Sequence, residues 1–263
     1  MHRLETAYLF VDGGYLRGVL NGLSRDLFQV PIELSPHSLS NGFRKVFYYD
    51  CPPEQRDNET SDEFSQRSAQ YESWLGRLRE TPGVHLVEGS TSGRRKQRQK
   101  QVDVAIAVDM LSHSYRQNMT QATLLSGDLD FKPVVDALVR DGMWVTVWCE
   151  QASASRELWL SADSRRDLST RTIFDVLSDD VLRRFPRPDE FGQRRQTDVS
   201  GAVRRGYSVR DRSTAYLLET PQRWEIILHP EHDPVGEGRI GHVDKGFLER
   251  YAIVDREVIW EER

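Results

Sequence analysis

The chain of 263 residues contains little cysteine and no long apolar segment. Its two cysteines, Cys51 and Cys149, cannot form a disulfide framework or a four-ligand zinc site by themselves, so we expect a reducing compartment. The longest apolar run, residues 104–108, is far shorter than the roughly 18 residues that a membrane-spanning helix needs. The N-terminus passes directly into an expected strand, without the sections of a secretion signal. These absences exclude a transmembrane protein and predict a cytoplasmic one.

No excess of positive charge is present either, since 36 basic residues stand against 41 acidic ones and the formal net charge is -5. This balance argues against a protein coated in positive potential but leaves room for a local basic patch. The run RRKQRQK at residues 94–100 is such a patch, and it follows the flexible sequence GSTSG. The chain also lacks the glycine spacing of a dinucleotide-binding turn and the GxxxxGK[ST] loop of P-loop proteins. Nicotinamide and P-loop chemistry are therefore excluded.

Residues 7–150 alternate short apolar runs with helical stretches, which is typical of a parallel sheet covered by helices on both faces. We expect helices at 62–80, 102–115 and 133–140; the second is apolar nearly all round and is predicted to be buried. With the first and fourth strands as neighbours, the strand order is 3-2-1-4-5. The expected strands are residues 7–11, 45–49, 84–87, 122–125 and 144–148.

The C-terminal part of the chain has a different pattern of expected helices and strands. Helices are expected around 156–162 and 172–184. The segment at 185–192 is rich in proline, glycine and charge, which indicates a linker. The following β-type runs, at 216–219, 223–228 and 251–260, predict a small β-rich unit. We therefore expect an α/β domain at residues 1–170, a helix and linker at 171–198, and a β-rich accessory domain at 199–263.

Three aspartates follow expected strands. Asp12 comes after the first strand in VDGG, whereas Asp128 and Asp130 come after the fourth in SGDLDF. In an open parallel sheet, ligands bind outside the carboxyl ends of the strands, where the winding reverses. Two carboxylates that meet there repel one another unless a cation joins them. Ser126 has no base partner that would make it a nucleophile, so we expect it to shape the aspartate turn beside the substrate.

A fourth carboxylate, Asp103, lies at the start of the apolar helix at 102–115 and is a candidate third metal ligand. Asp109 lies about 9 Å further along the helix axis and about 240° around it, so it cannot share an ion with Asp103 and we interpret it as structural. The seven histidines are scattered without metal-ligand spacing. Hard oxygen donors without a local histidine or cysteine cluster favour Mg²⁺ or Mn²⁺ over zinc.

Three sequence blocks carry a family resemblance. YLFVDGGYL, KQVDVAIAVDML and TLLSGDLDFKPVV, in this order and spacing, resemble the NYN domain, a PIN-like nuclease fold. The resemblance covers residues 5–165, and SGDLDF is its most specific part. It implies a small metal-dependent ribonuclease whose acidic cluster binds Mg²⁺ or Mn²⁺. By matching motif, the cluster would consist of Asp12, Asp103, Asp128 and Asp130.

The predicted reaction is hydrolysis of phosphodiester bonds in RNA, mainly single-stranded. Asp12 and Asp128 are the expected principal metal ligands, Asp103 a ligand directly or through water, and Asp130 a water-orienting group. Many members of the family carry asparagine three residues after the first aspartate; this chain has Tyr15, a candidate stacking surface for a base. A site of charge about -4 also needs nearby cations to admit RNA. The candidates are Arg94, Arg95, Lys96, Arg98 and Lys100.

Two other readings stay open. One is a non-catalytic RNA-binding or regulatory module that retains the fold, and metal-dependent turnover distinguishes it. The other is a receiver-like phosphoryl-transfer domain, which would need a lysine at the end of the fifth strand, where this chain has Trp148, Cys149 and Glu150. A protein partner or a second copy of the chain could bind through the C-terminal domain, which the resemblance does not cover.

Overall fold

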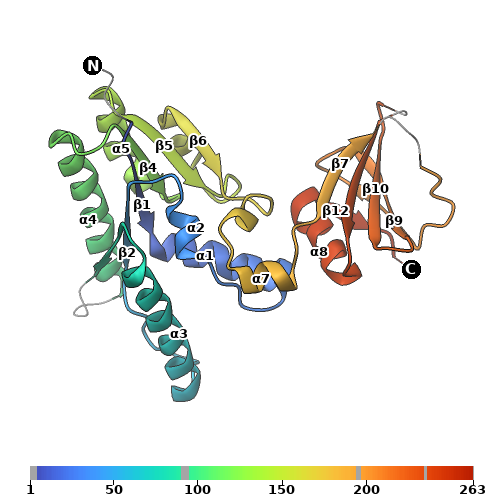
Figure 1. The fold of residues 1–263 in the computed structure, drawn as a ribbon, viewed down its shortest axis with the longest axis horizontal. Coiled ribbons are helices and arrows are strands. Elements are labelled where there is room, and N and C mark those ends of the chain that lie inside the picture. Colours follow the sequence, from blue (N-terminus) through green and yellow to red (C-terminus); the bar gives the residue numbers. More distant parts are fainter. Residues whose placement is uncertain (1–4, 90–94, 194–196, 234–235, 263) are drawn as a thin grey trace. The chain divides into compact units, whose positions relative to one another are not determined.

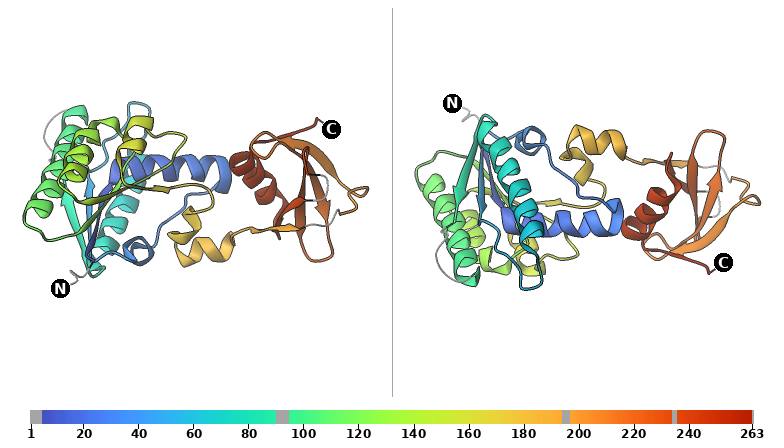
Figure 2. Two further views of the ribbon diagram at one scale, coloured as in Figure 1. Left: turned by 90° about the horizontal axis from the view of Figure 1, so that it is seen from above. Right: turned by 90° about the horizontal axis from the view of Figure 1, so that it is seen from below.

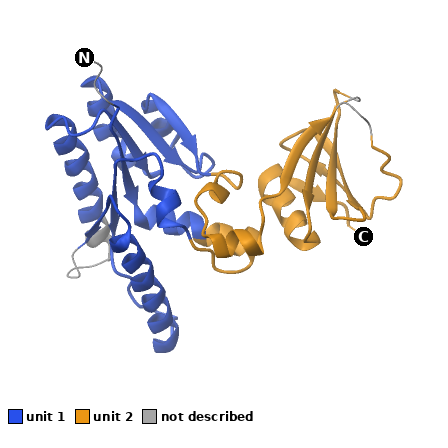
Figure 3. Ribbon diagram, viewed as in Figure 1, with its two compact units in different colours: residues 1–20, 34–168 blue, residues 21–33, 169–263 orange. Residues whose placement is uncertain are grey.

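The computed structural model describes residues 5–89, 95–193, 197–233 and 236–262. The chain forms two compact units, which Figure 3 shows in different colours. The first unit contains Met1–Leu20 and Leu34–Leu168, and the second contains Asn21–Glu33 and Ser169–Arg263. Within the described ranges, no helix has the length and apolar character needed to cross a membrane.

A six-stranded parallel sheet forms the centre of the first unit (Figure 1). Its order, β3-β2-β1-β4-β5-β6, confirms the predicted 3-2-1-4-5 arrangement and adds a sixth strand at the edge. The chain winds outward from β1 to β3 and then crosses to β4 on the other side, so the winding reverses between β1 and β4. The strands are β1 (Ala7–Asp12), β2 (Lys45–Asp50), β3 (Val84–Glu88), β4 (Gln121–Leu125), β5 (Trp144–Cys149) and β6 (Ser164–Asp167).

Helices cover both faces of this sheet, as predicted (Figures 1 and 2). On one face, α4 (Arg95–Tyr115), α5 (Lys132–Arg140) and α6 (Arg156–Ser161) contribute to a core with alternate residues of the strands. Because successive strand residues point to opposite faces, Phe47 joins this core while Tyr48 points the other way, where its ring meets Trp74 at 6.0 Å. The other face carries α1 (Gly13–Leu23) and α3 (Ser61–Glu80), with the short α2 (Pro36–Ser40) between them in the chain.

Local signals set the ends of several of these helices. The Thr60 side chain accepts a hydrogen bond from the backbone N–H of Glu63, and the Glu63 carboxylate accepts one from the N–H of Thr60, so α3 begins with a capping box. Pro133 lies in the first turn of α5. Gly142 follows α5 with a φ of 80°, a backbone conformation that favours glycine.

Helix α4 differs from its prediction at the start and on one face. It begins at Arg95, so most of the basic run forms its first turns rather than a loop. Val102, Ile106 and Met110 pack on the sheet, whereas Val104 and Val108 are 62% and 54% exposed. The helix is therefore not buried all round, because a helix on the surface of a sheet can cover it with only one stripe of side chains.

An antiparallel sheet forms most of the second unit, with order β12-β8-β9-β10-β11-β7, and α8 (Lys245–Arg256) packs on it. The unit also contains η1 (Ser24–Phe28), η3 (Ile173–Asp175) and α7 (Asp179–Arg184). A separate β-rich C-terminal region was predicted and is confirmed. Its strands are β7 (Asp189–Gln193), β8 (Arg204–Ser208), β9 (Ser213–Glu219), β10 (Trp224–Pro230), β11 (Glu237–His242) and β12 (Val258–Trp260).

Three predictions for this region were wrong. The expected linker contains β7, which pairs with β11 and uses polar residues because it lies at the edge of the sheet. The helix expected at 172–184 is broken into η3 and α7. Residues 251–260, predicted as a strand, contain the end of α8 and only the short β12. The β-branched residues in this segment favour a strand. The segment instead begins within α8, because the apolar face of this helix, with Phe247, Leu248 and Tyr251, is buried in the core.

Aromatic side chains from distant segments form the core of the second unit. Phe28, at the end of η1, lies 5.5 Å from Phe247 of α8 and 5.3 Å from Phe185 between ring centroids. The guanidinium of Arg250 donates a hydrogen bond of 2.7 Å to the carbonyl of Leu27. Residues 21–33 are therefore integrated into the unit through both apolar and polar contacts.

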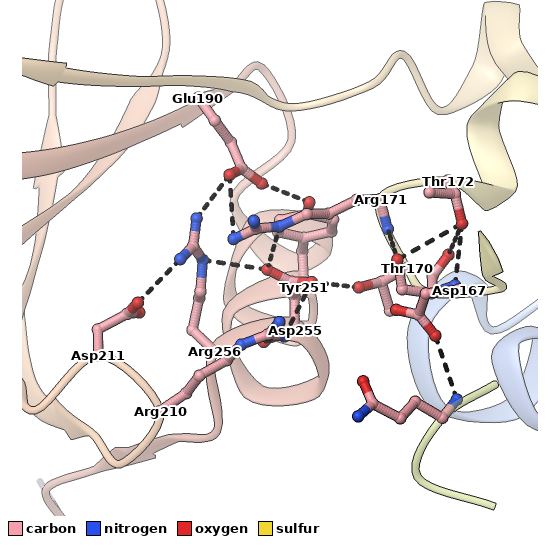
Figure 4. A network of polar contacts seen from close by, with 12 residues as sticks. Asp167, Thr170, Arg171, Thr172, Glu190, Arg210, Asp211, Tyr251, Asp255 and Arg256 are labelled. Carbon is pink, nitrogen blue, oxygen red and sulfur yellow. Dashed lines mark hydrogen bonds and ion pairs between the residues drawn. The ribbon is translucent and has the colours of Figure 1, made fainter. Parts of the chain in front are cut away.

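A network of ion pairs centres on Asp255, whose side chain is buried (Figure 4). Its carboxylate accepts hydrogen bonds from the Thr170 hydroxyl and from Nε of Arg171, the latter at 3.1 Å. Arg256 lies 3.0 Å from the same carboxylate and also pairs with Glu190 of β7. A buried carboxylate requires such partners, and here they join α8 to the first strand of the sheet and to the segment that precedes it.

Candidate active site

Asp12 and Ser126 join the two strands between which the winding of the parallel sheet reverses. Asp12 ends β1, with 7% of its surface exposed, and Ser126 follows β4 and is fully buried. The Ser126 hydroxyl donates a hydrogen bond of 3.0 Å to Oδ2 of Asp12, and the backbone N–H of Tyr15 donates one of 3.0 Å to Oδ1. Both oxygens of this carboxylate are thus held in a defined orientation at the carboxyl ends of β1 and β4.

The turn after β4 presents the next two acids. The hydroxyl of Ser126 accepts a hydrogen bond of 3.3 Å from the N–H of Asp128, whose Oδ1 accepts one of 3.0 Å from the N–H of Asp130. Asp128 thereby caps the short 3-10 helix η2 (Leu129–Phe131). Asp128 and Asp130 are both exposed. Ser126 therefore shapes the aspartate turn as expected, and it also orients Asp12.

Asp103 of α4 lies within electrostatic range of the other three acids. Burial raises its pKa to about 6, and the negative charges of Asp12, Asp128 and Asp130 contribute to this rise against the opposing effect of Lys100. Burial likewise raises the pKa of Asp12, and the Asp128 charge adds to this, while the hydrogen bonds from Tyr15 and Ser126 lower it. The four predicted acids, from three separate segments, therefore lie within electrostatic range of Asp103, and their role as a metal site stays a prediction.

The chemistry of this site suits a hard cation in part. Carboxylate oxygens are the donors that Mg²⁺ and Mn²⁺ prefer, and mutual repulsion among the acids is what a divalent ion would relieve. Within the described residues, however, no three side chains of histidine, cysteine, aspartate or glutamate are close enough together to form a ready ligand set. The type and charge of these donors therefore fit such an ion. The described residues do not, however, form a closed coordination shell for it.

Asp109 has a different environment from Asp103. The hydroxyl of Tyr49 donates a hydrogen bond of 2.8 Å to its Oδ2, and Tyr49 is itself fully buried in β2. Asp109 thus serves as a hydrogen-bond acceptor between α4 and the sheet. This contact agrees with the structural role that its spacing from Asp103 indicated.

Tyr15 contacts the strand ends with both its ring and its hydroxyl. The hydroxyl accepts a hydrogen bond of 2.9 Å from the backbone N–H of Glu150, just after β5. The ring covers Gly127 so closely that a Cβ placed on this glycine would lie 2.8 Å from it. Tyr15 thus connects the segments after β1, β4 and β5, and Gly127 is required for that contact. Its predicted stacking on a base stays a prediction.

The basic run can be placed only in part. Arg94 lies outside the described residues, and the side chains of Arg95, Lys96 and Arg98 do so as well, although their backbone belongs to the first turns of α4. Lys100 is exposed, and its charge lowers the pKa of Asp103. The run therefore leads into the helix that carries an acid of the site, and its role in substrate binding stays a prediction.

Sequence reasoning missed a buried carboxylate, Asp50, at the end of β2. It is 2% exposed and forms an ion pair with Arg17 of α1, whose charge in turn lowers the pKa of Asp12. The rule that selected Asp12 and Asp128, a carboxylate at the end of a strand, applies equally to Asp50 in the sequence KVFYYD. The signal was therefore present, but the arginine partner becomes visible only in the folded chain.

The fold and this site define a class: an α/β protein with a parallel sheet and an acidic cluster at the point where its winding reverses. Residues 44–169 match the NYN domain model, so this part of the chain is an NYN domain and the family predicted from the three sequence blocks is confirmed. The match includes the segments with Asp103, Asp128 and Asp130. It begins after the strand that bears Asp12, which the structure places in the same sheet.

No curated protein is significantly similar to this chain. Among solved structures, the chain is similar to a protein of unknown function from Vibrio parahaemolyticus, at 19% sequence identity and a TM-score of 0.46. That match covers 68% of this chain and all of the other.

Proposed function

We propose that this protein is a metal-dependent ribonuclease that hydrolyses phosphodiester bonds in single-stranded RNA. The observation that carries the proposal is the electrostatic coupling of the four acids: the charges of Asp12, Asp128 and Asp130 contribute to the raised pKa of Asp103, and that of Asp128 contributes to the raised pKa of Asp12. NYN domains form a PIN-like nuclease family associated with RNA, which supports a nuclease reaction at this site.

A divalent ion, Mg²⁺ or Mn²⁺, would be held by Asp12 and Asp128, with Asp103 as a third ligand directly or through water. When bound, such an ion lowers the pKa of water and stabilises negative charge on a phosphate group. The raised pKa of Asp103 means that a cation and a proton compete for this carboxylate. Binding of the ion is therefore expected to release a proton near pH 6.

The side chains of this chain have distinct tasks in the proposed reaction. Ser126 and the N–H of Tyr15 hold both oxygens of Asp12, so its carboxylate needs little reorganisation when it acts. The exposed carboxylate of Asp130 is suited to accept a hydrogen bond from the attacking water and to orient it. The run from Arg94 to Lys100 supplies positive charge for the RNA backbone.

We further propose that the β-rich segment at 199–263 acts as an accessory domain that selects the substrate or a protein partner, including a second copy of the chain. This segment contributes α8 and the strands β8 to β12 to the second unit, which also includes β7 and residues 21–33, and this supports an accessory role. Cys51 and Cys149 do not form a disulfide with each other, which fits the cytoplasmic location that we propose for the enzyme.

The decisive experiment is a cleavage assay with single- and double-stranded RNA and DNA, with and without Mg²⁺ or Mn²⁺. We expect cleavage of single-stranded RNA that requires the ion and is abolished by Asp128→Asn, which removes one charge at nearly constant volume. Asp57→Asn is the matched control, because Asp57 is exposed in the loop before α3. Far-UV circular dichroism should be unchanged in both variants.

Either of two results would contradict the proposal. Full activity of the Asp128→Asn variant with Mn²⁺ would show that the cleavage uses another site. Binding of RNA without turnover, under every metal condition, would favour a non-catalytic RNA-binding or regulatory module that retains the fold.

A further inference from the structure

Arg17 and Asp50 form an ion pair beside the acidic site that the proposed reaction has not used. Arg17 lies on the second turn of α1, five residues after Asp12, and its Nη1 donates a hydrogen bond to Oδ2 of Asp50. The Asp50 side chain is 1% exposed, whereas 41% of the Arg17 side chain is exposed. One partner is thus buried in the protein, and the other reaches the surface.

Several contacts hold Arg17 in place. Oδ1 of Asp50 accepts a hydrogen bond of 2.7 Å from the N–H of Cys51, which orients the carboxylate that binds the guanidinium. The guanidinium carbon lies 5.6 Å from the ring centroid of Tyr71 on α3. A Cβ on Gly13 would lie 2.8 Å from the Asp50 carboxylate, so the glycine allows α1 to begin this close to the end of β2.

Arg17 places a positive charge beside the four acids, and an RNA-cleaving site needs such a charge to bind phosphate. Four carboxylates repel a phosphate group, and Arg17 binds Asp50, the residue that directly follows the strand partner of Asp12, Tyr49. A guanidinium has five N–H donors in a planar arrangement that matches a phosphate, and the structure shows one of them donating to Asp50. Because 41% of the Arg17 side chain is exposed, a second anion can reach it.

We propose that Arg17, held by Asp50, is a substrate-binding residue that contacts a phosphate of the RNA on the β2 side of the acidic site. The inference rests on the proposed ribonuclease function and adds a specific contact to it. Asp50 is a positioning residue that acts through Arg17. The phosphate lies next to the scissile bond rather than at it, because Arg17 extends from α1 toward β2, away from Asp128, which follows β4 on the other side of β1.

A purely structural role is the alternative, in which Arg17 only neutralises the buried charge of Asp50. Removing the charge of Asp50 distinguishes the structural role of Arg17 from a role in RNA binding. In an Asp50→Asn background, no buried carboxylate depends on Arg17, so replacing the arginine should no longer affect the protein if its role is structural. If Arg17 contacts RNA, the replacement should weaken RNA binding in either background.

The experiment measures binding of a fluorescein-labelled single-stranded oligoribonucleotide to the full chain by anisotropy, in Mg²⁺, over a series of salt concentrations. All variants carry Asp128→Asn, so that the RNA stays intact. Arg17→Met is introduced both into the chain that retains Asp50 and into the chain that carries Asp50→Asn. Arg116→Met is the control, because Arg116 is exposed just after α4, about 20 Å along that helix from Asp103.

We expect Arg17→Met to weaken binding about tenfold or more in both backgrounds, as loss of a charge-assisted hydrogen bond does. The slope of log affinity against log salt should fall by about 0.7, and Arg116→Met should change neither quantity. Equal affinity of the Asp50→Asn variant with and without Arg17→Met would overturn the inference, even if the wild-type protein cleaves RNA. If Arg17→Met alone fails to fold, the double variant still decides the question.

Failure of the proposed function would be recognised separately. In that case, the wild-type protein would leave RNA intact with every metal tested, whatever the binding data show. A loss of affinity through Arg17→Met in both backgrounds would then still support Arg17 as an RNA contact.

Discussion

Ser126 donates a hydrogen bond to Asp12 across 114 residues of sequence, and this bond joins the ends of β1 and β4. The same hydroxyl accepts a hydrogen bond from the backbone N–H of Asp128, so one buried serine connects two acids of the candidate active site. The orientation of the acids therefore depends on a residue that need not touch the substrate.

Replacing Ser126 should consequently reduce both stability and cleavage. In Ser126→Ala, the buried carboxylate of Asp12 loses one hydrogen-bond donor, which should lower the free energy of unfolding by about 1–3 kcal/mol. Misplacement of the carboxylate should slow cleavage by roughly 10-fold to 100-fold. Urea unfolding and single-turnover cleavage measure the two effects. Ser65→Ala, at an exposed position of α3, should change neither, and wild-type activity of Ser126→Ala would refute the orienting role.

The two aspartates of α4 should differ in their effect on activity. Asp103 shares the electrostatic environment of the acidic site, whereas Asp109 accepts a hydrogen bond from Tyr49. We expect Asp103→Asn to reduce metal-dependent cleavage far more than Asp109→Asn, while Asp109→Asn should have the larger effect on α4 packing. Initial rates at saturating Mn²⁺ and thermal melting test this pair. The reverse order of activities would identify Asp109 as the helix acid of the site.

The raised pKa of Asp103 predicts how stability depends on pH without metal. The folded protein holds the Asp103 proton up to about pH 6, whereas the ordinary pKa of an aspartate is 3.8, so the contribution of this proton to the free energy of unfolding is fully present below pH 3.8. That contribution is lost as the pH rises through about 6. Asp103→Asn should flatten this part of the stability profile and melt at a higher temperature than wild type above the window. Thermal melting in EDTA measures both, and an Mg²⁺-induced rise in melting temperature should be smaller in the variant.

The basic run should act on binding more than on the chemical step. Neutralising Arg94, Arg95 and Lys96 together should raise the KM for RNA with a smaller change in kcat. Each phosphate contact on a single strand contributes about 0.7 to the slope of log affinity against log salt, so the slope should fall by about 2. Kinetics and anisotropy at several salt concentrations give these values. A slope equal to that of wild type would show that the run is only a solvated surface.

The packing of η1 against α8 predicts a large effect of Phe28 on the second unit. Phe28 is 1% exposed and contacts Phe185 and Phe247, so Phe28→Ala should cost about 3–5 kcal/mol of stability in this unit. Phe191→Ala is the control, since Phe191 is 41% exposed in the same unit. Urea unfolding followed by hydrogen exchange distinguishes the unit affected. Equal midpoints for the two variants would show that residues 21–33 are not part of this core.

Strong local patterns account for what sequence reasoning predicted well. The apolar runs of β1 and β4 are short and bounded by turns, so their strands and the positions of Asp12 and Asp128 follow from alternation and chain order. The predictions failed where packing outweighs local preference. Residues 251–254 have a β-type pattern, yet Tyr251 and its neighbours continue a helix because an apolar helical face covers the second sheet.

The amino-acid pattern was enough to predict the parallel sheet, the order of its strands and the NYN family, and it selected the four acids as candidates. These depend on hydrophobic period and on residues that directly follow a strand, and both are local properties of the chain. The folded structure was needed to show that Ser126 orients Asp12, that Arg17 pairs with Asp50 and that Phe28 packs in the second unit. Each of these contacts joins residues far apart in the chain, and their proximity results from the packing of whole elements.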